Sequence, residues 1–123
     1  MAKEFQIGNM ADDLVELTLQ LCGKDQDHTP RFPERFYDSY VTRIVDTALD
    51  IQEAVSLAND DRENSLPERR RLQSRAEAKC VFLNHLIRVA WRFGWISDKQ
   101  QERWQGLTTA LRYKIYNWWK STK

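Results

Sequence analysis

Cations spaced along predicted helices are the residues of this chain best suited to chemistry. Arg71, Arg75 and Lys79 lie four residues apart, which places them on one face of a helix. Arg88 and Arg92 repeat that spacing farther along the chain. Guanidinium groups bind phosphate through paired hydrogen bonds, and aligned cations release counterions from a nucleic acid. The pattern therefore indicates a phosphate-binding face.

The same cations allow a second interpretation, which stays open on the sequence alone. Further basic residues surround the row: Arg69, Arg70, Arg103, Arg112, Lys114, Lys120 and Lys123. Acidic residues of the preceding predicted helix could pair with them, within one bundle or between subunits. These are Asp38, Asp46, Asp50 and Glu53. A solvated or ion-paired face is then the alternative to a nucleic-acid face.

The charge is divided unevenly between the two halves of the chain, although the net charge is only +1. Residues 1–60 hold 5 Lys and Arg against 12 Asp and Glu, a balance of −7, whereas residues 61–123 hold 14 against 6, a balance of +8. Such asymmetry suggests either a nucleic-acid partner or a complementary surface for self-assembly.

The hydrophobic spacing predicts the helices that position these residues. Apolar residues recur three and four apart over about residues 10–22, 34–59, 66–93 and 97–121, and no stretch alternates with the period of a strand. Ser65 and Ser97 are suited to cap the last two helices, and Gly94 to end the third. With 123 residues, four Gly and three Pro, we expect one all-α domain, an oligomeric up-down-up-down four-helix bundle.

Motifs of catalysis, metal binding or membrane insertion are not found in this sequence. There is no Glu-x-x-His pair, P-loop or GxGxxG, and no apolar run approaches 18 residues. Cys22 and Cys80 lack a CxxC spacing and are expected to be buried, inert thiols, so a Cys80–His85 nucleophile is disfavoured. We expect a cytoplasmic protein without a secretory signal, catalytic residues, metal or cofactor.

Two adjacent tryptophans near the end of the chain predict an interface. Side chains at neighbouring helical positions point about 100° apart, so Trp118 and Trp119 cannot both face one core. We expect one of them at a subunit or partner interface, where tryptophan is a strong anchor. Base stacking next to Lys120 is the alternative.

Four stretches of the chain carry a family resemblance. They are YVTRIVDTALDI at residues 40–51, RRRLQ at 69–73, ISDKQ at 96–100 and WWKS at 118–121. Together they resemble the accessory variability determinant family of diversity-generating retroelements, small bacterial four-helix-bundle proteins. The same broad group includes the four-helix proteins encoded in ribosomal-RNA intervening sequences.

The resemblance implies a function without catalysis. Members of the accessory family form a pentameric barrel with a basic surface, bind the retroelement's reverse transcriptase and nucleic acid, and are required for mutagenic complementary-DNA synthesis. It implies an RNA- or DNA-binding or polymerase-facing set comprising Arg69, Arg70, Arg71, Arg75, Lys79, Arg88, Arg92, Arg112, Lys114 and Lys120. The alternative is a self-assembling structural bundle of the intervening-sequence type, without a nucleic-acid role.

Overall fold

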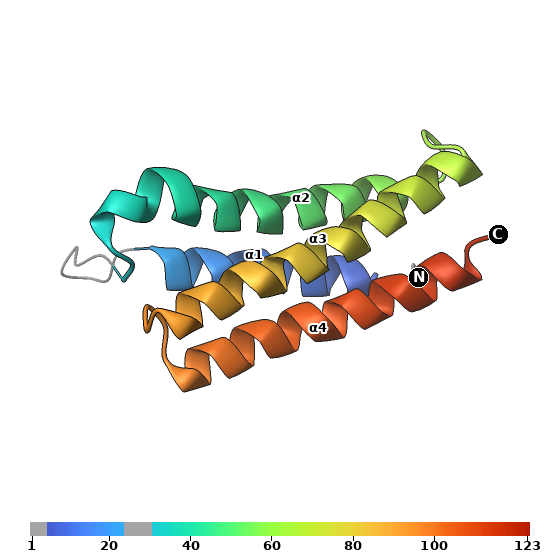
Figure 1. Cartoon of the computed structure of the whole chain (residues 1–123). Coiled ribbons are helices and arrows are strands. Elements are labelled where there is room, and N and C mark those ends of the chain that lie inside the picture. Colours follow the sequence, from blue (N-terminus) through green and yellow to red (C-terminus); the bar gives the residue numbers. More distant parts are fainter. Residues whose placement is uncertain (1–4, 24–30) are drawn as a thin grey trace.

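The regular structure of the chain is entirely helical in the part that the computed structural model describes, residues 5–23 and 31–123. Its α-helices are α1 (Gln6–Cys22), α2 (Thr42–Ala58), α3 (Leu66–Arg92) and α4 (Asp98–Ser121) (Figure 1). The predicted all-α class with four helices is confirmed over these residues. The connection between the first two predicted helices, residues 23–33, lies mostly outside them. None of the described helices is both long enough and apolar enough to cross a membrane.

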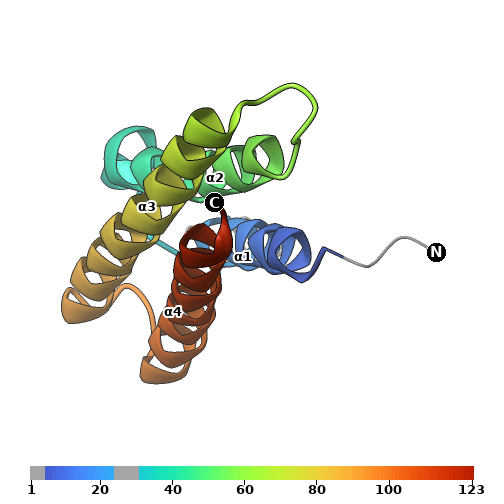
Figure 2. The ribbon, with the colours of Figure 1, turned by 90° about the vertical axis from the view of Figure 1, so that its right-hand side faces the viewer.

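Each α-helix packs against two others. α2 lies between α1 and α3, and α4 contacts both α3 and α1, so the four helices surround a shared interior (Figure 2). The end of α4 lies against the start of α1. There the Lys114 Nζ donates to the Gln6 Oε1 at 3.5 Å, and the rings of Phe5 and Trp118 meet edge to face with centroids 5.3 Å apart.

Side-chain caps fix the starts of α3 and α4, as predicted. The Ser65 hydroxyl accepts the backbone N–H of Glu68 at 3.3 Å. Ser97 and Gln100 form a full capping box, in which each side chain accepts the other residue's backbone N–H, at 3.1 and 2.8 Å. Gly94 ends the turn after α3 with φ +75°, a left-handed conformation that glycine adopts without the clash a Cβ would cause.

The segment before α2 is helical but is wound differently from the α-helix that the spacing predicts from residue 34. Glu34–Phe36 form a 3₁₀ turn (η1) and Tyr37–Val41 a π-helical segment (η2). The Thr42 hydroxyl donates to the carbonyl of the first π-helical residue at 2.7 Å. The Tyr40 hydroxyl donates to a backbone carbonyl of α3, also at 2.7 Å. These contacts, which apolar spacing does not reveal, accompany the wider winding.

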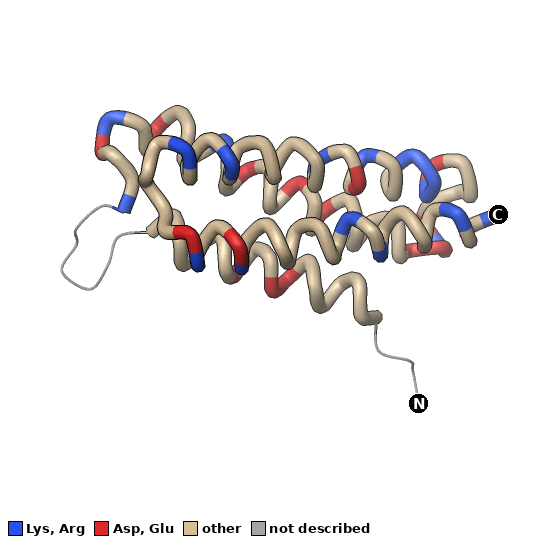
Figure 3. Tube along the Cα trace, turned by 60° about the horizontal axis from the view of Figure 1, so that its bottom comes forward, with Lys and Arg blue, Asp and Glu red and all other residues tan. Residues whose placement is uncertain are grey.

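α1 begins one turn earlier than the predicted residue 10. Ile7 and Met10 are half-buried against the core and continue the helical face of buried Leu14 at intervals of three and four. The opposite face is acidic, with Asp12, Asp13 and Glu16 exposed. α1 therefore carries negative charge and no Lys or Arg, which Figure 3 shows as red positions without blue.

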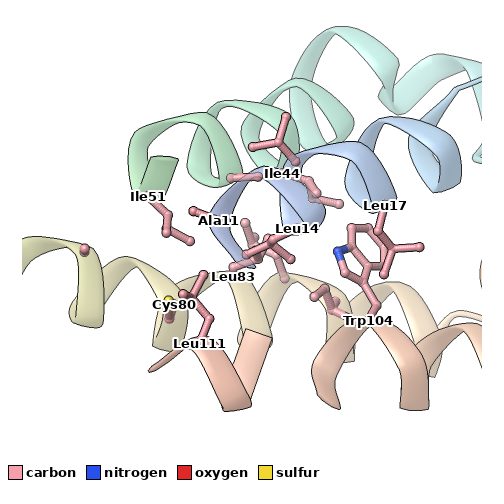
Figure 4. Packing of buried hydrophobic residues seen from close by; sticks show 14 of the residues in the cluster. Ala11, Leu14, Leu17, Ile44, Ile51, Cys80, Leu83, Trp104 and Leu111 are labelled. Atoms are coloured by element: carbon pink, nitrogen blue, oxygen red, sulfur yellow. The ribbon is translucent and has the colours of Figure 1, made fainter. Parts of the chain in front are cut away.

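The core is formed by one apolar face from every α-helix (Figure 4). Leu14, Ile44, Leu83 and Leu111 each have no exposed surface. Trp104 is the largest fully buried side chain, and its indole Nε1 donates to the Thr18 hydroxyl of α1 at 3.0 Å. Because a buried N–H needs a partner, this bond allows a large polar-tipped ring inside the bundle.

Replacing Trp104 by Ala tests this core. We expect Trp104→Ala to lower the free energy of unfolding by about 3–5 kcal/mol, because it leaves a cavity and orphans Thr18. The matched change Trp91→Ala removes a ring that is 39% exposed and should cost about 1 kcal/mol, the value of its hydrogen bond to Asp98. Urea unfolding measures both, and equal losses would contradict the assignment of Trp104 to the core.

Candidate nucleic-acid interface

The first two arginines of the predicted binding set close helix ends. The Arg69 Nε donates to the carbonyl of Ala58, the last residue of α2, at 2.8 Å. The last carbonyls of a helix have no partner within that helix, so Arg69 supplies one. The half-buried Arg70 does the same for α4, because its Nη1 donates to the carbonyls of Trp119, at 3.1 Å, and of Thr122.

Arg70 also covers an aromatic ring. Its guanidinium carbon lies 4.5 Å from the centroid of the Trp119 ring, within the range of a cation–π contact. The first turn of α3 is thereby tied to the last turn of α4. Arg69 and Arg70 consequently hold the bundle together, in addition to any part they take in binding.

Two cations of the row on α3 are ion-paired. Arg71 binds Glu68 of its own helix at 2.5 Å, and the hydrogen bond from Arg71 lowers the pKa of that carboxyl. Lys79 binds Asp50 of α2 at 3.3 Å. Asp50 is one of the acidic residues that the sequence suggested as partners for these cations, and it forms such an ion pair with Lys79. Both pairs remain partly exposed and contribute little to stability.

The candidates on α4 contact three different helices. Arg112 binds Glu77 of α3 at 2.9 Å, which raises the pKa of the Arg112 guanidinium. Lys114 points to Gln6 of α1. Lys120 is exposed and lies over the ring of Tyr116 on its own helix. A single chain thus does not gather the predicted set on one face.

Five candidate cations are exposed and pair with no carboxylate among residues 5–23 and 31–123. They are Arg75, Arg88, Arg92, Lys114 and Lys120. Arg88 is one helical turn beyond Asn84, whose Nδ2 donates to Thr109 of α4 at 3.1 Å, so it lies on the α4 side of α3. Their charges are not neutralised by the described chain. They are accordingly the members best placed to bind phosphate.

A strip of aromatic side chains on the outer side of α4 was not recognised in the sequence. This aromatic strip consists of Tyr113, Tyr116 and Trp119, at intervals of three residues. Tyr113 is 58% and Tyr116 is 44% exposed, and the rings of Tyr116 and Trp119 stack at 6.0 Å with an interplanar angle of 26°. The regular spacing next to Lys120 was the signal that could have revealed it.

The paired tryptophans diverge as expected from their adjacent positions. Trp118 turns toward Phe5 and Trp119 toward Arg70, and each is half-buried. Both rings are therefore partly covered within one chain. A subunit or partner interface at this point stays a prediction.

The two cysteines are buried and unpaired. Burial raises the pKa of both thiols to about 12, which favours the neutral, unreactive form. Besides burial, the charge of Glu77 raises the pKa of Cys80 and that of Arg112 lowers it. Among the residues that the structure describes, no three His, Cys, Asp or Glu side chains gather where they could hold a metal ion.

Comparison with known proteins provides no assignment. No protein-family model matches the chain, and no curated protein shows significant similarity to it.

The structural and the free arginines should differ in their effect on stability. We expect Arg70→Ala to lower the free energy of unfolding by about 1–3 kcal/mol, because two carbonyls at the end of α4 lose their charged donor. Arg75→Ala should change it by less than about 0.5 kcal/mol, since its side chain is exposed. Urea unfolding compares the two variants, and a stable Arg70→Ala protein would refute the tie between α3 and α4.

The raised thiol pKa values predict protection from labelling. At about pH 8 an ordinary thiol is partly ionised, whereas Cys22 and Cys80 should stay protonated and not react with an aromatic disulfide reagent until urea unfolds the chain. Stability should fall as the pH rises above about 8.5, because the unfolded thiols then lose protons that the folded thiols keep. Rapid labelling of the native protein would contradict this.

Proposed function

We propose that the chain is a non-enzymatic accessory factor that binds nucleic acid together with the reverse transcriptase of a diversity-generating retroelement. The observation that carries the proposal is that five cations of the predicted set on α3 and α4 are exposed and have no carboxylate partner among the described residues: Arg75, Arg88, Arg92, Lys114 and Lys120. Uncompensated Arg and Lys side chains on a bundle are what phosphate binding requires. The family resemblance supplies the polymerase as the protein partner and the bacterial cytoplasm as the compartment.

The composition of α3 supports a phosphate partner rather than internal neutralisation. Between residues 66 and 92 there are seven Lys and Arg and two Glu. Both Glu residues are already bound, Glu68 by Arg71 and Glu77 by Arg112. The excess charge of α3 therefore needs solvent, a nucleic acid or an acidic surface of another chain.

The proposed factor acts as a homo-oligomer, and the resemblance implies a pentamer of up-down-up-down bundles. The contacts between the start of α1 and the end of α4, and between the start of α3 and the same end, support that chain direction. Exposed apolar side chains support assembly, with Phe93 68% and Leu19 51% exposed.

The alternative function, a self-assembling structural bundle, is favoured by a different observation. The exposed face of α1 carries Asp12, Asp13 and Glu16 and no cation, while α3 carries an excess of cations. Two copies could join these faces without nucleic acid. The two functions differ in what the free arginines bind, so the same variants separate them.

Nucleic-acid binding should depend on the free arginines of α3. We expect Arg75→Ala/Arg88→Ala/Arg92→Ala to weaken binding of template-repeat RNA, with and without the polymerase, and to flatten the salt dependence. For about six neutralised phosphates, the unaltered chain should lose about three orders of magnitude in affinity between about 50 and 200 mM salt. Fluorescence anisotropy titrations measure both effects.

A matched variant removes the same charge elsewhere. Arg35→Ala/Arg43→Ala/Arg62→Ala takes three exposed cations from three segments outside α3 and α4 and should retain more affinity than the α3 variant. Light scattering on each sample reports the assembly. Absence of binding at low salt, combined with an α3 variant that falls apart into monomers, would overturn the proposal in favour of the structural bundle.

A further inference from the structure

The aromatic strip exposes more ring surface than the packing of the bundle requires. Tyr113 and Tyr116 are 58% and 44% exposed, although α4 buries its apolar face elsewhere through Trp104, Leu111 and Ile115. Neither tyrosine hydroxyl is needed to satisfy a buried group. The rings thus lie on the surface as flat apolar faces, beside the seam between α3 and α4.

Cations surround these rings at short range. Arg112 lies 5.7 Å from the ring centroid of Tyr113, and Lys120 lies 5.6 Å from that of Tyr116. Arg70 lies over the Trp119 ring. Every member of the strip therefore has a positive group beside it, and that is the composition of surfaces that bind single strands: aromatic platforms for bases, with cations for phosphates.

A hollow in the seam extends the strip toward α3. Ser74 and Glu77 of α3 and Tyr116 and Trp119 of α4 line it, with a volume of about 160 Å³. The carboxylate of Glu77 is bound by Arg112, so it presents little free negative charge to a ligand. The hollow offers room beside the stacked rings for the edge of a planar group.

We propose that the aromatic strip stacks the unpaired bases of a single-stranded nucleic acid while the exposed, unpaired Lys120 beside it binds phosphate. The proposal rests on the proposed function and specifies its ligand. A duplex presents phosphates but keeps its base faces stacked inside, so it cannot use Tyr113 and Tyr116. Because every base has a π-face, the strip binds with little sequence preference.

The dimensions of the strip suit a few consecutive bases. Tyr113 and Trp119 are six residues apart, which is about 9 Å along a helix with a rise of 1.5 Å per residue. Stacked bases of one strand are separated by about 3.4 Å, so the strip spans two to three base steps. Arg88, on the α4 side of α3, lies in the direction in which the strand would continue along the seam.

The test separates rings from charges. Tyr113→Leu/Tyr116→Leu removes both exposed rings and keeps the net charge, whereas Tyr113→Phe/Tyr116→Phe retains the rings. A labelled short oligouridine is titrated with the full-length protein, and a duplex RNA of the same length serves for comparison. We expect the Leu variant to lose about 5- to 150-fold in oligouridine affinity for each stacked base, the Phe variant to be close to the original, and the slope with salt to be unchanged.

The controls make a failure interpretable. Trp91→Leu/Phe93→Leu removes two exposed rings at the turn between α3 and α4 and should not affect oligouridine binding. Duplex affinity should be the same in all these variants. Unchanged oligouridine affinity in the Leu variant would overturn the stacking proposal. If the light-scattering mass of that variant also changed, the strip would be identified as an interface between copies. Binding of neither RNA at low salt would instead refute the proposed function.

Discussion

The packing of the four α-helices depends on the burial of the Trp104 indole. A ring of this size can be fully buried only if its N–H finds an acceptor, and α4 meets that need with a hydroxyl of α1. α1 is therefore joined to α4 by a directional bond as well as by apolar contacts. With α2 packed on α1 and α3 packed on α4, that bond closes the ring of helices around one core.

The arginines show why the type of a residue does not reveal its use. Arg69, Arg70 and Arg71 are neighbours of the same chemistry, yet one closes α2, one closes α4 and one pairs with its own helix. Which helix ends lie opposite the start of α3 is a property of the assembled bundle. The sequence therefore identifies the cations and predicts which of them share a helix face. Only the packing distinguishes those that bind other parts of the bundle from those left free.

The fold was more predictable than the site because it depends on repeated local signals. Serine caps, a left-handed glycine and apolar residues at intervals of three and four define α3 and α4 to within one residue at each end. The π-helical segment Tyr37–Val41 escaped prediction, since its apolar residues keep the spacing of an α-helix. The aromatic strip escaped as well, because rings spaced along a helix resemble core residues until their exposure is known.

The tight turn at Gly94 has a consequence for the order in which the bundle assembles. α3 and α4 together form a long helical hairpin whose two members are separated by five residues, so their contacts close over a short loop. Contacts that are local in sequence form early, whereas α1 and α4 meet across most of the chain. The seam that holds the cations and rings is therefore formed by contacts that are local in sequence. Because α4 follows the other three α-helices in the chain, a chain under synthesis completes the proposed ligand-binding seam only after α1, α2 and α3 have been made.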